Sequence, residues 1–170
     1  VEVASGLSLV AWGLVQKVVV ADRLAPDVDW LFLQAAPDSR LVLLGAVGLG
    51  VQLLADFGGY TALALGLARL VGVRLSENFD RPFAATSTPE FWRRWHITLG
   101  RWMADHVYVP IARGGQASLA RLGVATVATF LLVGLWHDLS WSMVVFGLWH
   151  GAWALAATLF GRMAPPLPRV

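Results

Sequence analysis

Two histidines stand in segments where an ionisable group is costly. His96 ends the Arg- and Trp-rich run EFWRRWH at 90–96, and His137 ends the apolar run GLWH at 134–137. Ionisable residues in membrane-type segments are rare and are read as functional by default. A neutral imidazole in a low-dielectric setting accepts a proton readily, because desolvation disfavours its charged form. His137 could therefore deprotonate a hydroxyl as that oxygen attacks an acyl carbon; the alternative is a helix-end histidine hydrogen-bonded to a carbonyl.

The other histidines allow more than one interpretation. His96 either holds an acyl carbonyl or a second substrate, or is an interfacial polar residue. His150, in the run LWHG, either faces the interior of a helix bundle or donates a structural hydrogen bond, and His106 is interpreted as structural. The chain has no His-Glu-x-x-His sequence and no histidine pair four residues apart. A zinc site made of His96, His137 and His150 has no support from spacing, so we predict no metal site.

The composition indicates a membrane protein. The 170 residues are 57% hydrophobic and 14% charged, whereas soluble domains carry about 25% charged residues. Seven arginines lie between residues 69 and 113, against four acids. Such a cluster could indicate a nucleic-acid partner, but the apolar flanks favour the excess of basic residues found in cytoplasmic loops. We therefore expect no nucleic acid, and residues 74–113 on the cytoplasmic side.

The apolar runs predict the elements that must position these histidines. Residues 3–24 form one apolar segment, and 25–40 are interpreted as a loop. The apolar runs 41–55 and 60–73 are separated by Asp-Phe-Gly-Gly, which suggests a kinked or re-entrant helix pair. Two further runs, 122–137 and 139–160, contain no Asp, Glu, Lys or Arg. They predict two membrane spans joined at residues 136–140.

A helix start is predicted in the segment TSTPE at 86–90. Thr88 is expected as the N-cap, with Pro89 at the first helical position and Glu90 in the first turn. Aromatic and leucine side chains then recur at helical spacing up to Trp102, with arginines between them. This pattern is typical of an amphipathic helix lying in the membrane interface. The simpler alternative is an Arg- and Trp-rich anchor with no other role.

These patterns together predict an all-α, polytopic membrane protein with about four or five membrane-embedded helices and one interfacial amphipathic helix. The absence of cysteine excludes disulfides, thiol nucleophiles and cysteine-based metal sites. The chain begins with Val, and no charged region precedes an apolar core, so no signal peptide is expected. Because residues 164–170 read as a tail or a cut end, we expect a fragment of a longer polytopic protein.

Several motifs of this chain strongly resemble the membrane-bound O-acyltransferase family. They are ENFDRPF at 77–83, EFWRRWHITL at 90–99, YVPI at 108–111 and GLWH at 134–137, with GLVQKVVVAD at 13–22 and DFGGY at 56–60. Within the family they look most like the alginate O-acetyltransferase branch, which is close to the teichoic-acid D-alanyl transfer proteins. The resemblance covers nearly the whole chain. Residues 1–170 would then form a partial domain, without the family's N- and C-terminal spans.

The resemblance implies roles for named residues. The family's essential histidine maps onto His137, and its upstream polar partner maps onto His96, so these two are the expected catalytic residues. The expected substrate-binding residues are Arg93, Arg94, Trp95, Trp136, Asp138 and His150. The branch usually has Gly where this chain has Asp138, which could orient the imidazole, raise its pKa or mark a weaker enzyme. It also has an Asp-Tyr pair where this chain has Asp105-His106.

The implied reaction is transfer of an acyl group, with acetyl as the expected group, to or toward hydroxyls of an exopolysaccharide such as alginate. Alternatives are D-alanyl transfer toward teichoic acid and a non-catalytic membrane subunit of an acetylation complex. No bound cofactor is expected, and the donor would be acetyl-CoA or an acyl-carrier thioester. Expected partners are the lipid bilayer and a polysaccharide or periplasmic acetyltransferase, in a bacterial plasma (inner) membrane crossed several times. The fragment alone is not expected to be active.

Overall fold

The computed structural model describes residues 2–34, 38–116 and 118–163. The chain divides into two compact units, residues 1–78 and residues 79–170. All regular elements in the described ranges are helical. The prediction of an all-α protein is confirmed, and the two units are described separately.

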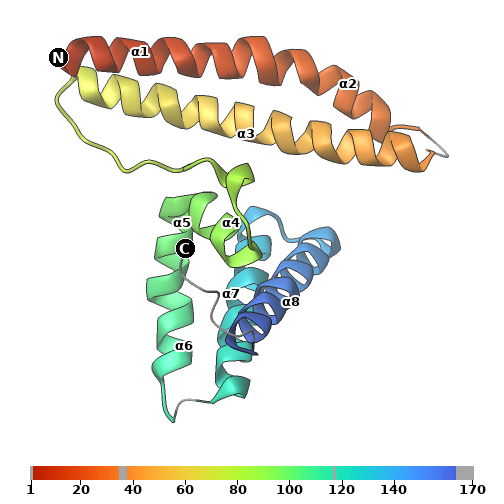
Figure 1. Cartoon of the computed structure of the whole chain (residues 1–170). Coiled ribbons are helices and arrows are strands. Elements are labelled where there is room, and N and C mark those ends of the chain that lie inside the picture. The colour runs from red at the N-terminus through yellow and green to blue at the C-terminus, as the bar shows by residue number, and fades with distance from the viewer. Residues whose placement is uncertain (1, 35–37, 117, 164–170) are drawn as a thin grey trace, which may run out of the picture. The chain divides into compact units, whose positions relative to one another are not determined.

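The first unit is a pair of long antiparallel helical rods. One rod joins α1 (Glu2–Leu14), the π-helix η1 (Val15–Ala21) and α2 (Asp22–Phe32), and the other is α3 (Ser39–Leu70). The two rods lie side by side along their length (Figure 1). Asp38 caps α3, since its carboxylate accepts a hydrogen bond from the backbone N–H of Arg40 at 2.8 Å.

The prediction of a loop at residues 25–40 is wrong for its first part, because α2 continues to Phe32. Val28 and Leu31 are buried at 2% and 9% exposure. They pack where α3 carries Gly48 and Gly45, which leave space for them. Burial of these two side chains therefore outweighs the polar composition of the segment.

The expected break in α3 is also wrong, because the helix is continuous through Asp56-Phe-Gly-Gly59. Gly59 is buried against the first rod, and a Cβ atom there would lie 2.8 Å from the carbonyl oxygen of Gly13. Gly66 has the same relation to Gly6, at 2.7 Å. These glycines allow two backbones to approach closely, as small residues do in membrane helix pairs, and do not end the helix.

Lys17, on η1, joins the two rods by ion pairs. Its ammonium lies 2.8 Å from a carboxylate oxygen of Asp22 and 2.7 Å from one of Asp56. Each side chain of the trio is nearly half exposed in this chain. The Lys17 ammonium therefore offsets the negative charge of the Asp22 and Asp56 carboxylates, which would be energetically unfavourable in an apolar environment.

The second unit begins with short helices and ends in a long antiparallel pair. Its elements are η2 (Pro82–Ala84), α4 (Thr88–Arg94), α5 (Ile97–Met103), η3 (Ala104–Tyr108), α6 (Val109–Arg113), α7 (Leu119–His137) and α8 (Trp141–Met163). α5, η3 and α6 follow one another in a single rod (Figure 1). α7 and α8 pack together through Gly134 and Gly147, which meet backbone atoms of the opposite helix.

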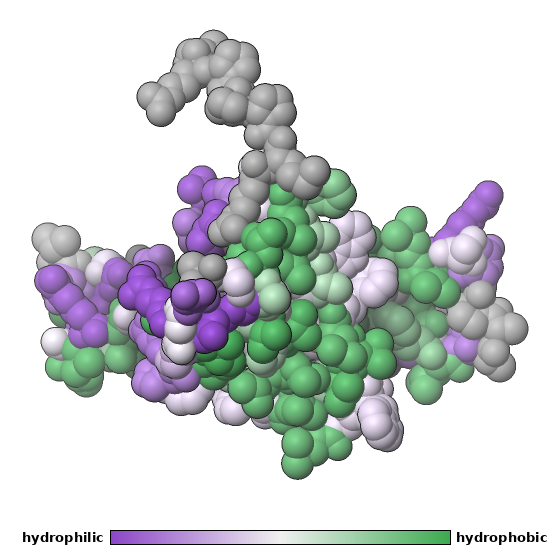
Figure 2. All heavy atoms as spheres, turned by 90° about the horizontal axis from the view of Figure 1, so that it is seen from below, coloured by the Kyte–Doolittle hydropathy of each residue, from purple (hydrophilic) through white to green (hydrophobic). Residues whose placement is uncertain are grey.

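Within the described residues, four helices are long and apolar enough to cross a membrane: Glu2–Phe32, Ser39–Leu70, Leu119–His137 and Trp141–Gly161. The last two confirm the pair of spans predicted from the charge-free runs. Large apolar side chains are exposed along all four, and Figure 2 shows hydrophobic residues over much of the face in view. Such a surface is stable only against lipid or further protein. The chain is therefore part of a multi-pass membrane protein.

The predicted amphipathic helix is divided in two by Trp95 and His96. α4 ends at Arg94, Trp95 is extended, and His96 has the left-handed backbone conformation with φ 45° and ψ 54°. The N-cap of α4 is Ser87, one residue before the predicted Thr88; its hydroxyl accepts from the backbone N–H of Glu90 at 3.3 Å. Pro89 and Glu90 lie in the first turn, as predicted.

Candidate active site

His96 is held at the junction of α4 and α5 by its backbone. Its carbonyl accepts a hydrogen bond from the N–H of Gly100 at 2.9 Å, which starts α5. A positive φ is uncommon for a residue other than glycine and persists where the surroundings impose it. His96 and Arg81 are the two such residues in the described part of the chain.

The structure brings His96 and His137, the two predicted catalytic residues, into one neighbourhood. The rings of His96 and Trp136 have centroids 6.3 Å apart, and those of Trp136 and His137 are 4.8 Å apart in an edge-to-face arrangement. Partial burial, and secondarily the charge of His137, lower the pKa of His96. His96 is therefore neutral at pH 7 and can accept a hydrogen bond or proton.

His137 lies at the last position of α7 and its side chain is exposed in this chain. The apolar enclosure expected from its sequence is not provided by the described residues, because the α7–α8 turn leaves the helix end open. The backbone N–H of the next residue, Asp138, donates to the carbonyl of Gly134 at 3.2 Å and so caps α7. The Asp138 side chain is exposed.

His150 belongs to a second aromatic cluster, centred on Trp92. The Trp92 ring lies 5.0 Å from the ring of His150, 5.2 Å from Phe130 and 6.2 Å from Phe146, edge to face in each case. The indole Nε1 of Trp92 is buried, with no hydrogen-bond partner among the described residues. The cluster joins α4 to both α7 and α8.

An open pocket of about 610 Å³ adjoins this second cluster. One wall is the segment before α4 together with Phe91 and Trp92, and the other is α8. It is lined by Pro82, Phe83, Ala85, Thr86, Ser87, Thr88, Phe91, Trp92, Trp149, His150 and Trp153. Aromatic walls with hydroxyl groups and one imidazole are suited to an apolar group that carries polar atoms. The sequence pattern did not predict this pocket.

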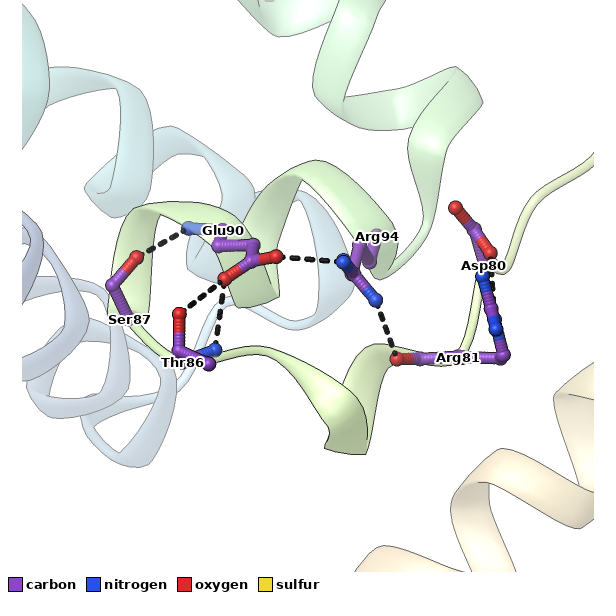
Figure 3. A network of polar contacts seen from close by, with 6 residues as sticks. All are labelled: Asp80, Arg81, Thr86, Ser87, Glu90 and Arg94. Carbon is purple, nitrogen blue, oxygen red and sulfur yellow. Dashed lines mark hydrogen bonds and ion pairs between the residues drawn. The ribbon is translucent and has the colours of Figure 1, made fainter. Parts of the chain in front are cut away.

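The two adjacent arginines differ in their surroundings. The Arg93 side chain is exposed, whereas Arg94 Nη2 donates to Oε1 of Glu90 at 2.6 Å and Nη1 donates to the carbonyl of Arg81 at 3.4 Å (Figure 3). Trp95, another predicted substrate-binding residue, packs among Phe79, Phe83 and Phe91. The charge of Arg94 is therefore used internally, while that of Arg93 faces outward.

His106 does not join either cluster. Its ring stacks on Trp102 with centroids 4.6 Å apart, and its Nδ1 lies 2.8 Å from the carbonyl oxygen of Trp102, four residues earlier. These contacts are local to α5 and η3 and agree with the structural role predicted for this residue.

The family is decided by a match over nearly the whole chain. The model of the membrane-bound O-acyltransferase family matches residues 5–168. The chain belongs to this family. We therefore interpret the histidine pair in terms of acyl transfer, the reaction that gives this family its name.

Curated relatives include a probable alginate O-acetylase AlgI of Azotobacter vinelandii, 39% identical over 88% of this chain and 30% of the relative. A peptidoglycan O-acetyltransferase of Helicobacter pylori is 34% identical over 88% of this chain and 28% of the relative. A teichoic acid D-alanyltransferase of Bacillus subtilis is 32% identical over 64% of this chain and 29% of the relative. The chain thus spans about a third or less of the length of these membrane-bound O-acyltransferase relatives.

Sequence reasoning missed how His96 is held. It placed His96 on a continuous helix, and it assigned Arg94 to substrate alone. The segment TSTPE signalled a helix start, and an acid three residues after Ser87 is typical of a capping pattern. That signal was present, but the reach of Glu90 to both Thr86 and Arg94 depends on the three-dimensional path of the preceding loop.

Proposed function

We propose that the chain is the histidine-bearing part, a partial domain, of a membrane-embedded enzyme that transfers an acetyl group to hydroxyls of an exopolysaccharide such as alginate. The observation that carries the proposal is the meeting of His96 and His137 beside Trp136. The relatives named alginate O-acetylase favour acetyl as the group and alginate as the acceptor class. Because these relatives are bacterial proteins, we place the enzyme in a bacterial plasma membrane.

In this proposal His137 is the general base. Its neutral imidazole takes the proton of the acceptor hydroxyl while that oxygen attacks the carbonyl carbon of a thioester donor. The new C–O bond forms, the C–S bond breaks, and the imidazolium returns its proton to the departing thiolate. His96, with its lowered pKa, is a neutral neighbour that positions the donor carbonyl or the acceptor.

The remaining predicted residues divide by their surroundings. Arg93, being exposed, attracts the anionic donor, either acetyl-CoA or an acyl-carrier thioester. Trp136, adjacent to both rings, supplies an apolar wall beside them, and Asp138 lies next to His137 at the open end of α7. His150, which lines the aromatic pocket, contacts the bound substrate there.

The test is complementation of a bacterium that lacks its own O-acetylase with the full-length parent gene. Wild type is expected to restore acetyl groups on the secreted polysaccharide, and His137→Ala is expected to restore none. His106→Ala is the matched control, since it removes a histidine of the same unit whose ring stacks on Trp102 and joins neither the His96–His137 pair nor the Trp92 cluster. Restoration by both histidine variants would contradict the general-base role and favour a non-catalytic subunit.

D-alanyl transfer toward teichoic acid is the second candidate, because teichoic acid D-alanyltransferases are among the relatives. If the wild-type gene restores no acetylation, the wild-type and His137→Ala genes are tested for D-alanine esters on teichoic acid in a host that lacks its own D-alanyltransferase. A carrier-protein donor and a polyanionic acceptor would then replace acetyl-CoA and the exopolysaccharide. A periplasmic acetyltransferase that completes transfer is a further proposed partner.

A further inference from the structure

We propose that Glu90 is a positioning residue for His96, acting through a polar network that holds the segment 79–86 against α4. The network is drawn in Figure 3. Its hydrogen bonds join Thr86, Glu90, Arg94 and Arg81, and its effect on His96 is exerted through the packing of Trp95. The catalytic consequence rests on the proposed function, whereas the geometric consequence does not.

The Glu90 carboxylate makes three contacts. Its Oε2 accepts hydrogen bonds from the backbone N–H and the hydroxyl of Thr86, both at 2.8 Å, and its Oε1 accepts from Arg94 at 2.6 Å. The Glu90 and Arg94 side chains are only 23% and 26% exposed. A partly sheltered carboxylate with three donors is firmly fixed, since hydrogen bonds to charged groups are the stronger kind.

Arg94 carries the network to the other end of the same segment. Its Nη1 donates to the carbonyl of Arg81, and its own carbonyl accepts from the backbone N–H of Asp80 at 3.0 Å. Glu90 therefore fixes Thr86 directly and Arg81 through Arg94. The segment between these two points carries Phe83, and Phe79 lies just before it.

Both phenylalanines pack on Trp95, the residue before His96. Trp95 lies 5.1 Å from Phe79 edge to face, 6.4 Å from Phe83, and 5.6 Å from Phe91, on which it stacks. The Trp95 side chain is thus enclosed by residues of the held segment and of α4. A fixed Trp95 leaves the chain at His96 little freedom to leave its left-handed conformation.

The two non-glycine residues with a left-handed backbone in the described chain both belong to this arrangement. Arg81 has φ 44° and offers its carbonyl to Arg94, and His96 has φ 45° two residues after Arg94. Conformations of this kind persist only where surrounding contacts determine them. We infer that the Glu90 network supplies those contacts and thereby aims the His96 ring at Trp136 and the end of α7.

The geometry can be tested without relying on catalysis, because the 170 residues contain no cysteine. His96→Cys and Trp136→Cys are introduced together into the full-length protein in membranes, with a protease site inserted after Gly115 between them. A short bifunctional thiol reagent is expected to keep the two fragments joined after cleavage. Each single-cysteine variant serves as the blank.

Adding Glu90→Gln to the cysteine pair is expected to reduce this cross-link about tenfold, since the amide cannot accept from both Thr86 and Arg94. Arg94→Lys keeps the charge but loses the forked contact with Arg81, so an intermediate yield is expected. Asp27→Asn, an exposed carboxylate of α2, is the matched control and should leave the yield unchanged. Undiminished cross-linking with Glu90→Gln would overturn the proposal, as would absence of cross-linking in the parent pair.

The catalytic arm uses the native histidines. Glu90→Gln is expected to lower kcat for acyl transfer about 10- to 100-fold with little change in KM for the donor, because a misplaced group slows the chemical step. A merely structural role would lower the amount of folded protein and leave kcat per folded molecule unchanged, which would overturn the inference. If no transfer is seen with any variant, the proposed function fails while the cross-linking result still stands.

Discussion

Replacing Gly147 with alanine tests whether the close crossing of α7 and α8 sets the relative position of the two candidate catalytic histidines. A Cβ atom at Gly147 would lie 2.7 Å from the carbonyl oxygen of Phe130 and from the Cα of Leu131. Both are backbone atoms and cannot rotate away. Ordinary contact begins at 3.4 Å, so the helices must separate locally by about 0.7 Å, the difference between these distances.

The energetic cost follows from overpacking. Extra methylene-sized groups in a packed interface cost about 1–3 kcal/mol, and the better helix propensity of alanine offsets about 1 kcal/mol. We therefore expect a net loss of stability of about 1 kcal/mol. α4 packs on α8 through Trp92, and α4 leads to His96, whereas His137 is carried by α7. Separating the helices shifts one histidine relative to the other.

The assay measures the rate of acyl transfer and the melting midpoint of the full-length protein. Since a misplacement of 1 Å can cost about 100-fold in rate, Gly147→Ala should lower kcat at least about tenfold. Gly161→Ala is the matched control, because nothing lies within 4 Å of a Cβ atom there and α8 should tolerate it. Equal rates and midpoints for both variants would refute the argument that this crossing positions the histidines.

Two further predictions concern charge. Lys17→Met removes the cation that pairs Asp22 and Asp56, so the amount of folded protein in membranes should fall. Asp56→Asn in the same background removes one of the two unpaired carboxylates and should restore part of it. If the second substitution restores nothing, the ion pair is not the reason for the loss. Burial and, secondarily, the charge of His137 lower the pKa of His96. The contribution of neutral His96 to folding stability is therefore present above the ordinary histidine pKa near 6.5, and it is lost as the pH falls through the lowered pKa of the folded state. The pH dependence of the melting midpoint on the acid side should therefore be weaker in His96→Gln, and unchanged dependence would contradict this.

The sequence predicts the spans best where composition alone decides them. α7 and α8 follow from two runs without charged residues, separated by a short polar turn, because a span needs only length and apolar side chains. The meeting of His96 and His137 could be anticipated only from the family resemblance. No periodicity relates residues that far apart in the chain.

The errors have a common physical cause, which is tertiary contact. Gly58 and Gly59 look like a helix break, yet they let α3 approach η1 and α1 closely, so their effect depends on the neighbouring helix. Val28 and Leu31 extend α2 because they are buried on α3. The left-handed turn at His96 follows from packing around Trp95 and from the Glu90 network, which a helical pattern of aromatic residues cannot reveal.

The backbone contacts between α1 and α3 also have a consequence for how the protein is made. Gly13 meets Gly59, and the Lys17 ammonium meets the Asp56 carboxylate, on the same stretch of the two rods. The rod that carries Lys17 also carries its partner Asp22, but α3 inserted alone would bring the Asp56 carboxylate into the bilayer without a cation, and that transfer costs several kcal/mol. Insertion of the two as one hairpin delivers the Asp56 carboxylate already paired with Lys17. Biogenesis is thus easiest when the hairpin leaves the insertion machinery as a single unit, after Leu70 has been synthesised.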